Sequence, residues 1–232
     1  MSKKQITLYS DELGPNGWKV AMVLNELGIP YETVLVDVFS SGSGMSKGEF
    51  TETINPNGRI PAIVDHLDDG DFVLWESVAI IGYLVSRYDA AHTYSFTGPR
   101  ETAEMNQWLL YQASGQGPYF GQASWFVYYH PEKNLTSVIQ RYRDEVRRVN
   151  GVLDGVLRKN GGWLVGGKCS VADLAFVIWT DVVVNWKPVM GDDFDLAKEA
   201  PAVHRWFNQM MALPGVDSVR RQREAAKMRF KA

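Results

Sequence analysis

The chain has 232 residues, enough for one large domain or two small ones. Its composition, 45% apolar and 22% charged with a net charge of -3, is that of a globular protein. It has no long basic run, which excludes nucleic-acid binding through a basic surface. No apolar stretch approaches the ~20 residues of a membrane span. The segment MSKKQITL lacks an apolar region, so we expect no secretory signal. One cysteine excludes an internal disulfide, which fits the reducing cytosol. Together, these features predict a cytoplasmic protein without a membrane or nucleic-acid partner.

The first 88 residues alternate between strand-like and helix-like patterns, in the order β-α-β, loop, β-β-α. A strand, a helix and a second strand in succession form a unit whose two strands run parallel. The first helix ends with Gly28 followed by Pro30, a usual stop signal. The loop, residues 40–48, is rich in Ser, Gly and Met. The expected elements are strands at 6–9, 33–38, 61–65 and 72–75 and helices at 18–27 and 77–88.

Residues 89–99, DAAHTYSFTGP, show no periodic pattern, and we interpret them as a linker. After the linker most of the chain is helical, beginning with an apolar stripe from Leu135 to Leu157. Residues 171–186 are apolar nearly all round, which predicts a buried central helix, and residues 202–213 predict an amphipathic helix. We therefore expect a domain at 1–88, a linker at 89–99 and an all-helical domain at 100–232.

The residue types most often used in catalysis or metal binding have structural explanations in this chain. Cys169 precedes Ser170 and Asp173, which have the spacing of a capping box at a helix start, so we interpret all three as structural. The histidines, at positions 66, 92, 130 and 204, do not lie three or four residues from one another or from the cysteine. This spacing predicts no metal site.

Two short motifs suggest recognition of an amino-acid head group. In NPNGRIP, Pro61 opens a strand, and in the cis form it would leave the backbone of Ile60 open to a ligand; a simple turn explains the pattern equally well. In WES, Ser77 is a natural N-cap, and the backbone at a helix N-terminus can bind a carboxylate. Glu76 beside it is either a surface acid or an acceptor for an ammonium group.

The turn GPNG, residues 14–17, connects the first strand to the first helix and contains neither Cys nor His. Its polar side chain is Asn16. Either Asn16 takes part in the chemistry of a site, or the segment is only a turn. Further on, residues 108–130 hold eight aromatic side chains, which fit either a bundle core or an apolar substrate surface. Gly115, Gly117 and Pro118 interrupt the helical pattern there, which predicts an irregular part.

NPNGRIP, WES and SVAD, in this order within residues 5–215, resemble the cytosolic glutathione transferases. PNGWKV, WLLYQASGQGPYFGQA and YRDEVRRV are more narrowly similar to a fungal subfamily close to a nitrogen-catabolite regulator known as a prion, and to the bacterial Nu-class enzymes. The resemblance implies an α/β thioredoxin-like N-terminal domain followed by an all-α C-terminal domain. It also implies glutathione as co-substrate, no metal, and a homodimer, here with Phe72, Met105 and Trp108 near the contact.

The resemblance also assigns roles to individual residues. Ile60, beside a cis-Pro61, would pair with the cysteinyl backbone of glutathione, and Arg59 would lie near its glycyl carboxylate. Glu76 and Ser77 would hold the γ-glutamyl ammonium and carboxylate. The implied glutathione-binding set is Asn16, Lys47, Arg59, Ile60, Pro61, Glu76 and Ser77, and the implied second-substrate set is Gln112, Tyr119, Trp125, Phe126 and Arg148.

Related classes keep a catalytic Ser or Cys directly after the first strand, whereas this chain has Gly14. The nucleophile would therefore be the thiol of bound glutathione, of which only ~3% is thiolate at pH 7. The amide of Asn16 would donate to the sulfur, helped by the positive end of the helix dipole. Lowering the thiol pKa by about one to two units takes about 1.4–2.7 kcal/mol. Ser10, at the end of the first strand, is the competing donor.

The function expected from the resemblance is conjugation of glutathione to apolar electrophiles. Two alternatives stay open: reduction of disulfides by glutathione, and a non-enzymatic regulatory protein that binds glutathione. The prion relative carries a long Asn-rich N-terminal extension, whereas this chain begins close to its first strand, so the resemblance does not extend to a prion role.

Overall fold

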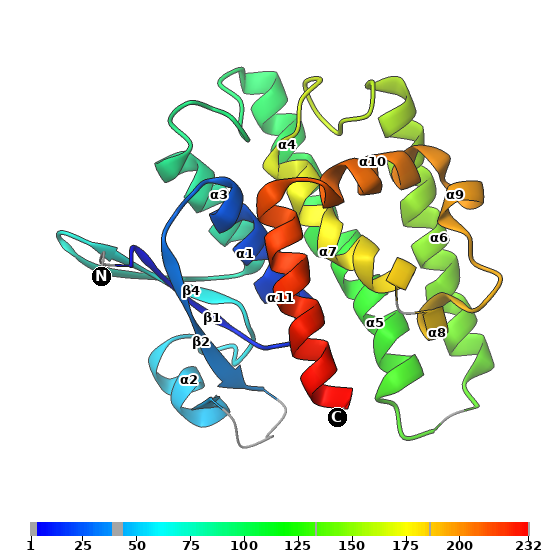
Figure 1. Cartoon of the computed structure of the whole chain (residues 1–232), viewed down its shortest axis with the longest axis horizontal. Coiled ribbons are helices and arrows are strands. Elements are labelled where there is room, and N and C mark those ends of the chain that lie inside the picture. The colour runs from blue at the N-terminus through cyan, green and yellow to red at the C-terminus, as the bar shows by residue number, and fades with distance from the viewer. Residues whose placement is uncertain (1–3, 39–43, 133, 186, 232) are drawn as a thin grey trace. The chain divides into compact units, whose positions relative to one another are not determined.

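The computed structural model describes residues 4–38, 44–132, 134–185 and 187–231 of the chain. It divides into two compact units, Met1–His92 with Ala212–Ala232, and Thr93–Met211. The first unit contains the sheet and the helices around it, and the second is helical (Figure 1). This is the α/β thioredoxin-like and all-α combination that the resemblance implied.

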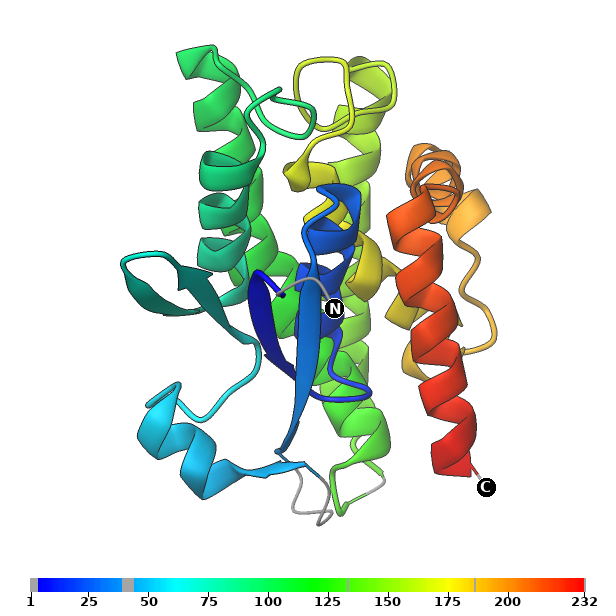
Figure 2. The same cartoon turned by 60° about the vertical axis from the view of Figure 1, so that its left-hand side comes forward.

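The sheet of the first unit has the strand order β3-β2-β1-β4-β5. β1 and β2 run parallel, with Ile6 opposite Tyr31, which confirms the predicted βαβ unit. β4 is antiparallel to both β1 and β5, and the turn of the β4–β5 hairpin projects from the sheet in both views (Figure 1, Figure 2). The strands are β1 (Ile6–Ser10), β2 (Tyr31–Asp37), β3 (Met45–Ser46), β4 (Ala62–Leu67) and β5 (Gly70–Trp75).

The helices of the first unit are α1 (Pro15–Glu26), α2 (Lys47–Thr53), α3 (Ser77–Tyr88) and α11 (Pro214–Lys231). α2 was not predicted, because its seven residues bury only Phe50 and show no periodic pattern. The hydroxyl of Ser46 begins this helix by accepting the backbone N–H of Glu49 at 3.2 Å. The predicted loop at 40–48 therefore contains β3 and the start of α2, and its residues 40–43 lie outside the described residues.

The C-terminal helix α11 belongs to the first unit, whereas the sequence analysis placed residues 212–232 in the helical domain. The physical reason is Glu26 at the end of α1, whose Oε1 accepts the backbone N–H groups of Gly215 at 2.7 Å and Val216 at 3.2 Å. These two N–H groups lie in the first turn of α11 and have no partner within the helix. α11 then packs along α1 (Figure 1). The domain division proposed from the sequence otherwise stays a prediction.

The second unit is organised around a buried helix, as predicted. Every residue of α7 from Val171 to Val183 is buried, while Trp186, included in the predicted helix, lies outside the described residues. The irregular part predicted near Gly115 is a π-helical turn, η1, between α4 and α5. The elements are α4 (Pro99–Tyr111), η1 (Gln112–Gln116), α5 (Gly117–Tyr128), α6 (Thr136–Lys159), α7 (Val171–Asn185), α8 (Lys187–Met190), α9 (Leu196–Glu199) and α10 (Pro201–Met211).

The capping box at the start of α7 has the structural role predicted for it. Asp173 Oδ2 accepts the backbone N–H and the hydroxyl of Ser170 at 3.0 and 3.1 Å. Its Oδ1 accepts the N–H of Leu164 and the indole N–H of Trp206, both at 3.1 Å. Burial raises the pKa of this carboxyl to about 6, and the four donors oppose the shift. The carboxylate thus joins α7, the preceding loop and α10 from the interior.

None of the helices in the part of the chain that the structure describes is long and apolar enough to cross a membrane. Within the same residues, no group of three His, Cys, Asp or Glu side chains could hold a metal ion.

Candidate functional site

The segment NPNGRIP forms a loop that ends in a cis peptide bond between Ile60 and Pro61, as the family resemblance implied. The buried side chain of Asn55 organises the loop. Its Nδ2 donates to the carbonyl of Arg59 at 2.6 Å, and its Oδ1 accepts the N–H of Asn57 at 2.9 Å. The role of Asn55 was not predicted, although an Asn-Pro dipeptide is a known turn signal. The loop thus fixes the backbone on both sides of Ile60.

Glu76 and Ser77 lie where β5 ends and α3 begins. Glu76 occupies the N-cap position and its carbonyl accepts the N–H of Ile80 at 2.9 Å, so α3 begins one residue earlier than an N-cap at Ser77 would require. The backbone of Glu76 is left-handed, with φ 73°. A non-glycine residue in this conformation costs on the order of 1–3 kcal/mol, and such residues cluster at ligand-binding sites. The Glu76 side chain is exposed, and that of Ser77 is buried.

Lys19 is a buried cation that the sequence analysis did not assign to the site. It lies on α1 between apolar neighbours, its exposed fraction is 1%, and its Nζ donates to Ser77 Oγ at 3.0 Å. Burial lowers the pKa of this ammonium to about 7, and the nearby carboxylate of Glu76 opposes the shift. A lysine inside an otherwise apolar helical stretch was the available signal, since lysine is almost never buried without a partner.

Three contacts bring the predicted motifs of the first unit together. Gly14 lies against Ile60, because a Cβ built on Gly14 would come 2.8 Å from Ile60 Cδ1. Ala62, directly after the cis-proline, pairs with Trp75 of the WES motif across β4 and β5. The bond from Lys19 then joins α1 to the start of α3. The turn at 14–17, the cis-proline loop and WES therefore meet at one end of the sheet.

Lys47 and Arg59 flank the same loop. Lys47 is the first residue of α2, and its Cε lies 3.5 Å from the position a Cβ would take on Gly58. Gly58 has φ 63°, a conformation that suits glycine, and it comes directly before Arg59. Both cationic side chains are exposed. The structure thus places two positive charges beside the cis-proline loop.

Asn16 and Ser10, the two predicted sulfur donors, have different surroundings. Asn16 is the second residue of α1 and is half-buried. Ser10 has an exposed fraction of 4%, and its hydroxyl donates to the carbonyl of Asp11 at 3.3 Å. Gly17 covers it, because a Cβ at Gly17 would come 1.9 Å from Ser10 Oγ. The Asp11 carboxylate shapes the turn by accepting two backbone N–H groups, at 2.8 and 2.9 Å.

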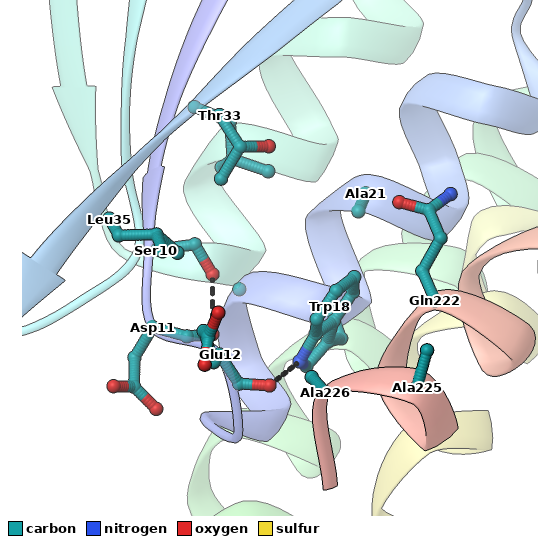
Figure 3. Close-up of a pocket in the computed structure, with 12 residues that line it drawn as sticks. Ser10, Asp11, Glu12, Trp18, Ala21, Thr33, Leu35, Gln222, Ala225 and Ala226 are labelled. Carbon is teal, nitrogen blue, oxygen red and sulfur yellow. Dashed lines mark hydrogen bonds between the residues drawn. The ribbon is translucent and has the colours of Figure 1, made fainter. Parts of the chain in front are cut away.

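A cavity of about 480 Å³ lies in the first unit between β1, β2, α1 and α11, and Gly17 of the turn lines part of it. Ser10 lines it together with Thr33, Leu35 and Trp18, whose indole N–H donates to the carbonyl of Glu12 at 3.0 Å (Figure 3). Asn16 and the residues of the cis-proline loop and WES do not line this cavity. The cavity therefore does not contain the point where the three motifs converge.

The predicted second-substrate residues on α5 form a cluster of aromatic rings in the second unit. Tyr119 and Phe126 both lie against Tyr142 of α6, with ring centroids 6.4 and 5.5 Å apart. Trp125 contacts Phe126 edge-on at 5.0 Å and is 42% exposed. The cluster therefore presents an apolar surface and is not completely enclosed in the helical core.

The surroundings of Gln112 do not fit its predicted role as a contact of the second substrate. Its side chain is fully buried, and its Nε2 donates to Gln116 Oε1 at 3.1 Å. Gln116 in turn donates to the carbonyl of Phe176 on α7 at 3.0 Å. The reason is the π-helical turn, which begins at Gln112 and directs both amides into the core. A side chain that is completely buried in this network does not fit contact with a second substrate.

Arg148, the predicted cation of the second-substrate set, lies on α6 and is 51% exposed. Its Nε donates to Glu145 Oε2 at 2.7 Å, and this bond is the largest cause that lowers the pKa of Glu145. Arg141 pairs with the same carboxylate at 3.0 Å. Arg148 also acts on Tyr111, whose pKa is raised by burial and lowered in part by this guanidinium. Arg148 is thus a surface cation held by one carboxylate.

Comparison with known proteins places this geometry in a family. The family model described as "Glutathione S-transferase, N-terminal domain" matches residues 13–87, and the one described as "Glutathione S-transferase, C-terminal domain" matches residues 118–214. A glutathione S-transferase-like protein of Aspergillus fumigatus is 46% identical over 219 residues, covering 91% of this chain and 92% of that protein.

Solved structures agree with the sequence comparison. Ure2p5 from Phanerochaete chrysosporium, cocrystallised with 1-(S-glutathionyl)-2,4-dinitrobenzene, is similar with a TM-score of 0.88 and 43% identity, covering 98% of each chain. The glutathione transferase URE2P6 from the same organism, in complex with oxidised glutathione, gives a TM-score of 0.87 and 43% identity over 97% of this chain and 100% of that one. The chain therefore belongs to the glutathione transferase family, among fungal relatives of the Ure2 type, as its motifs suggested.

Proposed function

We propose that this protein binds glutathione in its first unit and conjugates it to small apolar electrophiles, with Asn16 stabilising the thiolate. The observation that carries the proposal is the convergence of the turn at 14–17, the cis-proline loop and WES at one end of the sheet. Glutathione is the co-substrate of the family, and these are the segments that carry the implied contacts.

Each part of the tripeptide has a chemical counterpart among these residues. The backbone of Ile60 pairs with the cysteinyl unit in the manner of an added strand. The exposed carboxylate of Glu76 accepts the γ-glutamyl ammonium, and Ser77 with the start of α3 holds the α-carboxylate. The two exposed cations, Lys47 and Arg59, take the glycyl carboxylate.

The burial of Ser10 favours Asn16 as the donor that activates sulfur. The Ser10 hydroxyl is covered by Gly17 and already donates to the Asp11 carbonyl. Asn16 lies in the first turn of α1, where backbone N–H groups and the helix dipole also favour an anion. A donor that binds the thiolate more strongly than the thiol lowers the thiol pKa, which raises the fraction of reactive sulfur at neutral pH.

The second substrate is an apolar electrophile held on the aromatic surface of Tyr119, Trp125 and Phe126. Rings of this kind bind flat apolar molecules through dispersion and stacking. The conjugate bound to Ure2p5 is a glutathionyl dinitrobenzene, which is the product expected from such an electrophile. We infer the same class of substrate for this chain.

Reduction of disulfides by glutathione is the second candidate function. Arg148 supports it, because a half-exposed guanidinium can attract a second glutathione or stabilise its leaving thiolate. The related URE2P6 was solved in complex with oxidised glutathione, which is itself a disulfide.

We also propose a homodimer that meets at the exposed Phe72, Val73 and Trp75 of β5. Met105 and Trp108 are buried in the chain and offer no exposed apolar surface for that contact. Light scattering that gives only the monomer mass at micromolar concentration would contradict the dimer.

Steady-state assays test the proposed function directly. We expect glutathione-dependent turnover of 1-chloro-2,4-dinitrobenzene, and its loss in Asn16→Ala at neutral pH. A mixed disulfide of glutathione and mercaptoethanol, assayed in parallel, reports the second candidate function. A protein that binds glutathione but turns over neither substrate would be a non-enzymatic binding protein, contrary to the proposal.

A further inference from the structure

Lys19 extends from the second turn of α1 into the interior and ends at the first residue of α3. Its exposed fraction is 1% and that of Ser77 is 8%, and Nζ donates to Ser77 Oγ at 3.0 Å. A buried ammonium is costly unless it serves several partners. Lys19 thus holds a buried ammonium directly behind the first residue of α3.

The chemistry of the two groups fixes the direction of the Ser77 hydroxyl. A lysine ammonium has three donors and no acceptor, so Ser77 Oγ must accept from it. The hydroxyl keeps one hydrogen, which is then directed away from Lys19 to another acceptor. A neutral Lys19 amine would have a lone pair and could accept that hydrogen itself. The charge on Lys19 thus decides whether Ser77 is a donor for a ligand.

We propose that Lys19 is a positioning residue for the α-carboxylate of the γ-glutamyl group, acting through the Ser77 hydroxyl. The proposal rests on the glutathione site proposed above and adds to it a buried cation that touches no part of the ligand. The ammonium directs the Ser77 hydrogen toward the carboxylate and supplies positive charge behind it. The backbone N–H groups at the start of α3 provide the other donors.

The electrostatics around Lys19 support this role. α1 packs against β1, α3 and α11, and among the described residues the charge that shifts the pKa of Lys19 is the carboxylate of Glu76, at the start of α3. Burial lowers that pKa to about 7, so near neutral pH only part of the population carries the charge. A carboxylate bound at Ser77 favours the ammonium and raises the pKa. Binding of a carboxylate ligand should therefore take up a fraction of a proton just above pH 7.

Three matched ligands separate the carboxylate from the rest of the tripeptide. The first is S-methylglutathione, in which the thiol is blocked. The second carries 4-aminobutyryl in place of γ-glutamyl, so it keeps the ammonium and lacks the α-carboxylate. The third carries glutaryl, so it keeps the carboxylate and lacks the ammonium. Calorimetry in two buffers of different ionisation enthalpy gives the dissociation constant and the proton uptake together.

Lys19→Met should raise the dissociation constants of S-methylglutathione and the glutaryl ligand by about tenfold. It should change the dissociation constant of the 4-aminobutyryl ligand by less than twofold. Proton uptake, largest for the glutaryl ligand in the wild type, should vanish. In a Ser77→Ala background, Lys19→Met should have little further effect, because Lys19 acts through that hydroxyl. Lys159→Met, an exposed lysine at the end of α6, is the control that should change none of these values.

Equal weakening of all three ligands by Lys19→Met would overturn the proposal, since it would show a general structural effect. Unchanged affinities together with unchanged proton uptake in Lys19→Met would also overturn the proposal. If Lys19→Met does not fold, Lys19→Gln serves instead, because it keeps N–H donors and removes the charge. The blocked thiol makes these outcomes independent of thiolate activation. Failure of the wild type to bind any of the ligands would instead contradict the proposed glutathione site.

Discussion

Gly17 lies directly over Ser10, so close that a β-carbon on Gly17 would come 1.9 Å from Ser10 Oγ and 2.8 Å from Ser10 Cβ. The first turn of α1 can therefore approach the end of β1 only because position 17 has no side chain. The same contact covers the Ser10 hydroxyl. It separates the two candidate sulfur donors: Ser10 is buried beneath the helix, at the wall of the cavity between β1, β2, α1 and α11, and Asn16 lies in the helix's first turn.

Replacing Gly17 by alanine should destabilise the protein, although alanine is the better helix former. The added methyl group overpacks a buried contact, which costs about 1–3 kcal/mol. Gly155→Ala, in α6 where a Cβ meets nothing within 4 Å, is the control and should stabilise by up to about 1 kcal/mol. Urea denaturation compares the two. A Gly17→Ala variant as stable as the wild type would show that the two elements do not meet as described.

Lys19→Met should stabilise the unliganded protein most at low pH. The folded-state pKa of Lys19 is lowered from 10.5 to about 7, so the folded state binds fewer protons than the unfolded state between these values. Wild-type stability relative to the variant therefore rises with pH across this window and is lowest below pH 7. There the charged lysine costs on the order of 3–5 kcal/mol. Urea titrations at pH 6.5 and 9 measure the difference in the free energy of unfolding between Lys19→Met and the wild type. Lys159→Met is the control. A pH-independent difference would argue against a buried, titrating Lys19.

Several of these features could be predicted from the sequence, for reasons that are local. The βαβ unit and the buried α7 each follow from a contiguous pattern, and the cis peptide at Pro61 follows from the family resemblance that the NPNGRIP motif carries. α2 could not be found, since it buries one side chain, Phe50. The docking of α11 on α1 could not be found either, because it depends on Glu26, far away in the chain, which caps the helix.

Within the site, sequence reasoning identified the motifs but not the residues that support them. Lys19 was missed although it stands in an apolar helical stretch, because that pattern alone does not show that the charged residue points inward. Asn55 was missed although Asn-Pro is a turn signal, because its hydrogen bonds depend on the loop geometry. Gln112 was assigned to the substrate surface, whereas the π-helical turn directs it into the core. The glycines and the proline of this segment predict an irregular helix, but they do not show which side chains the π-helical turn directs inward.

Glu76→Gln should weaken glutathione binding by about tenfold or more and leave the fold intact. The substitution removes a charge-assisted hydrogen bond to the γ-glutamyl ammonium, worth about 1.5–3 kcal/mol. Glu76→Gly should weaken binding as well but raise stability by about 1 kcal/mol, because glycine relieves the left-handed backbone at φ 73°. Asp69→Asn, at the exposed hairpin turn, is the control. Calorimetry that finds the same dissociation constant for Glu76→Gln and wild type would remove Glu76 from the site.

Arg148→Ala should impair disulfide reduction by roughly tenfold and leave conjugation of an apolar electrophile nearly unchanged. A second glutathione or a departing thiolate needs the cation, worth about 1.5–3 kcal/mol as a charge-assisted bond, whereas a neutral electrophile rests on aromatic rings. Arg141→Ala is the matched control, because Arg141 pairs with the same Glu145 at 3.0 Å. Parallel assays with the mixed disulfide and the dinitrobenzene substrate measure the loss in each reaction. Equal losses in both reactions would assign Arg148 a structural role.

The ultraviolet absorbance of bound glutathione, titrated with pH, shows whether Asn16 stabilises the thiolate. In Asn16→Ala the apparent pKa of the bound thiol should rise by about one to two units, toward the ~8.5 of a free thiol. Ser10→Ala should titrate close to the wild type, because its hydroxyl is covered by Gly17. Identical titration curves for wild type and Asn16→Ala, at saturating glutathione, would show that Asn16 does not stabilise the thiolate and that other groups activate the thiol.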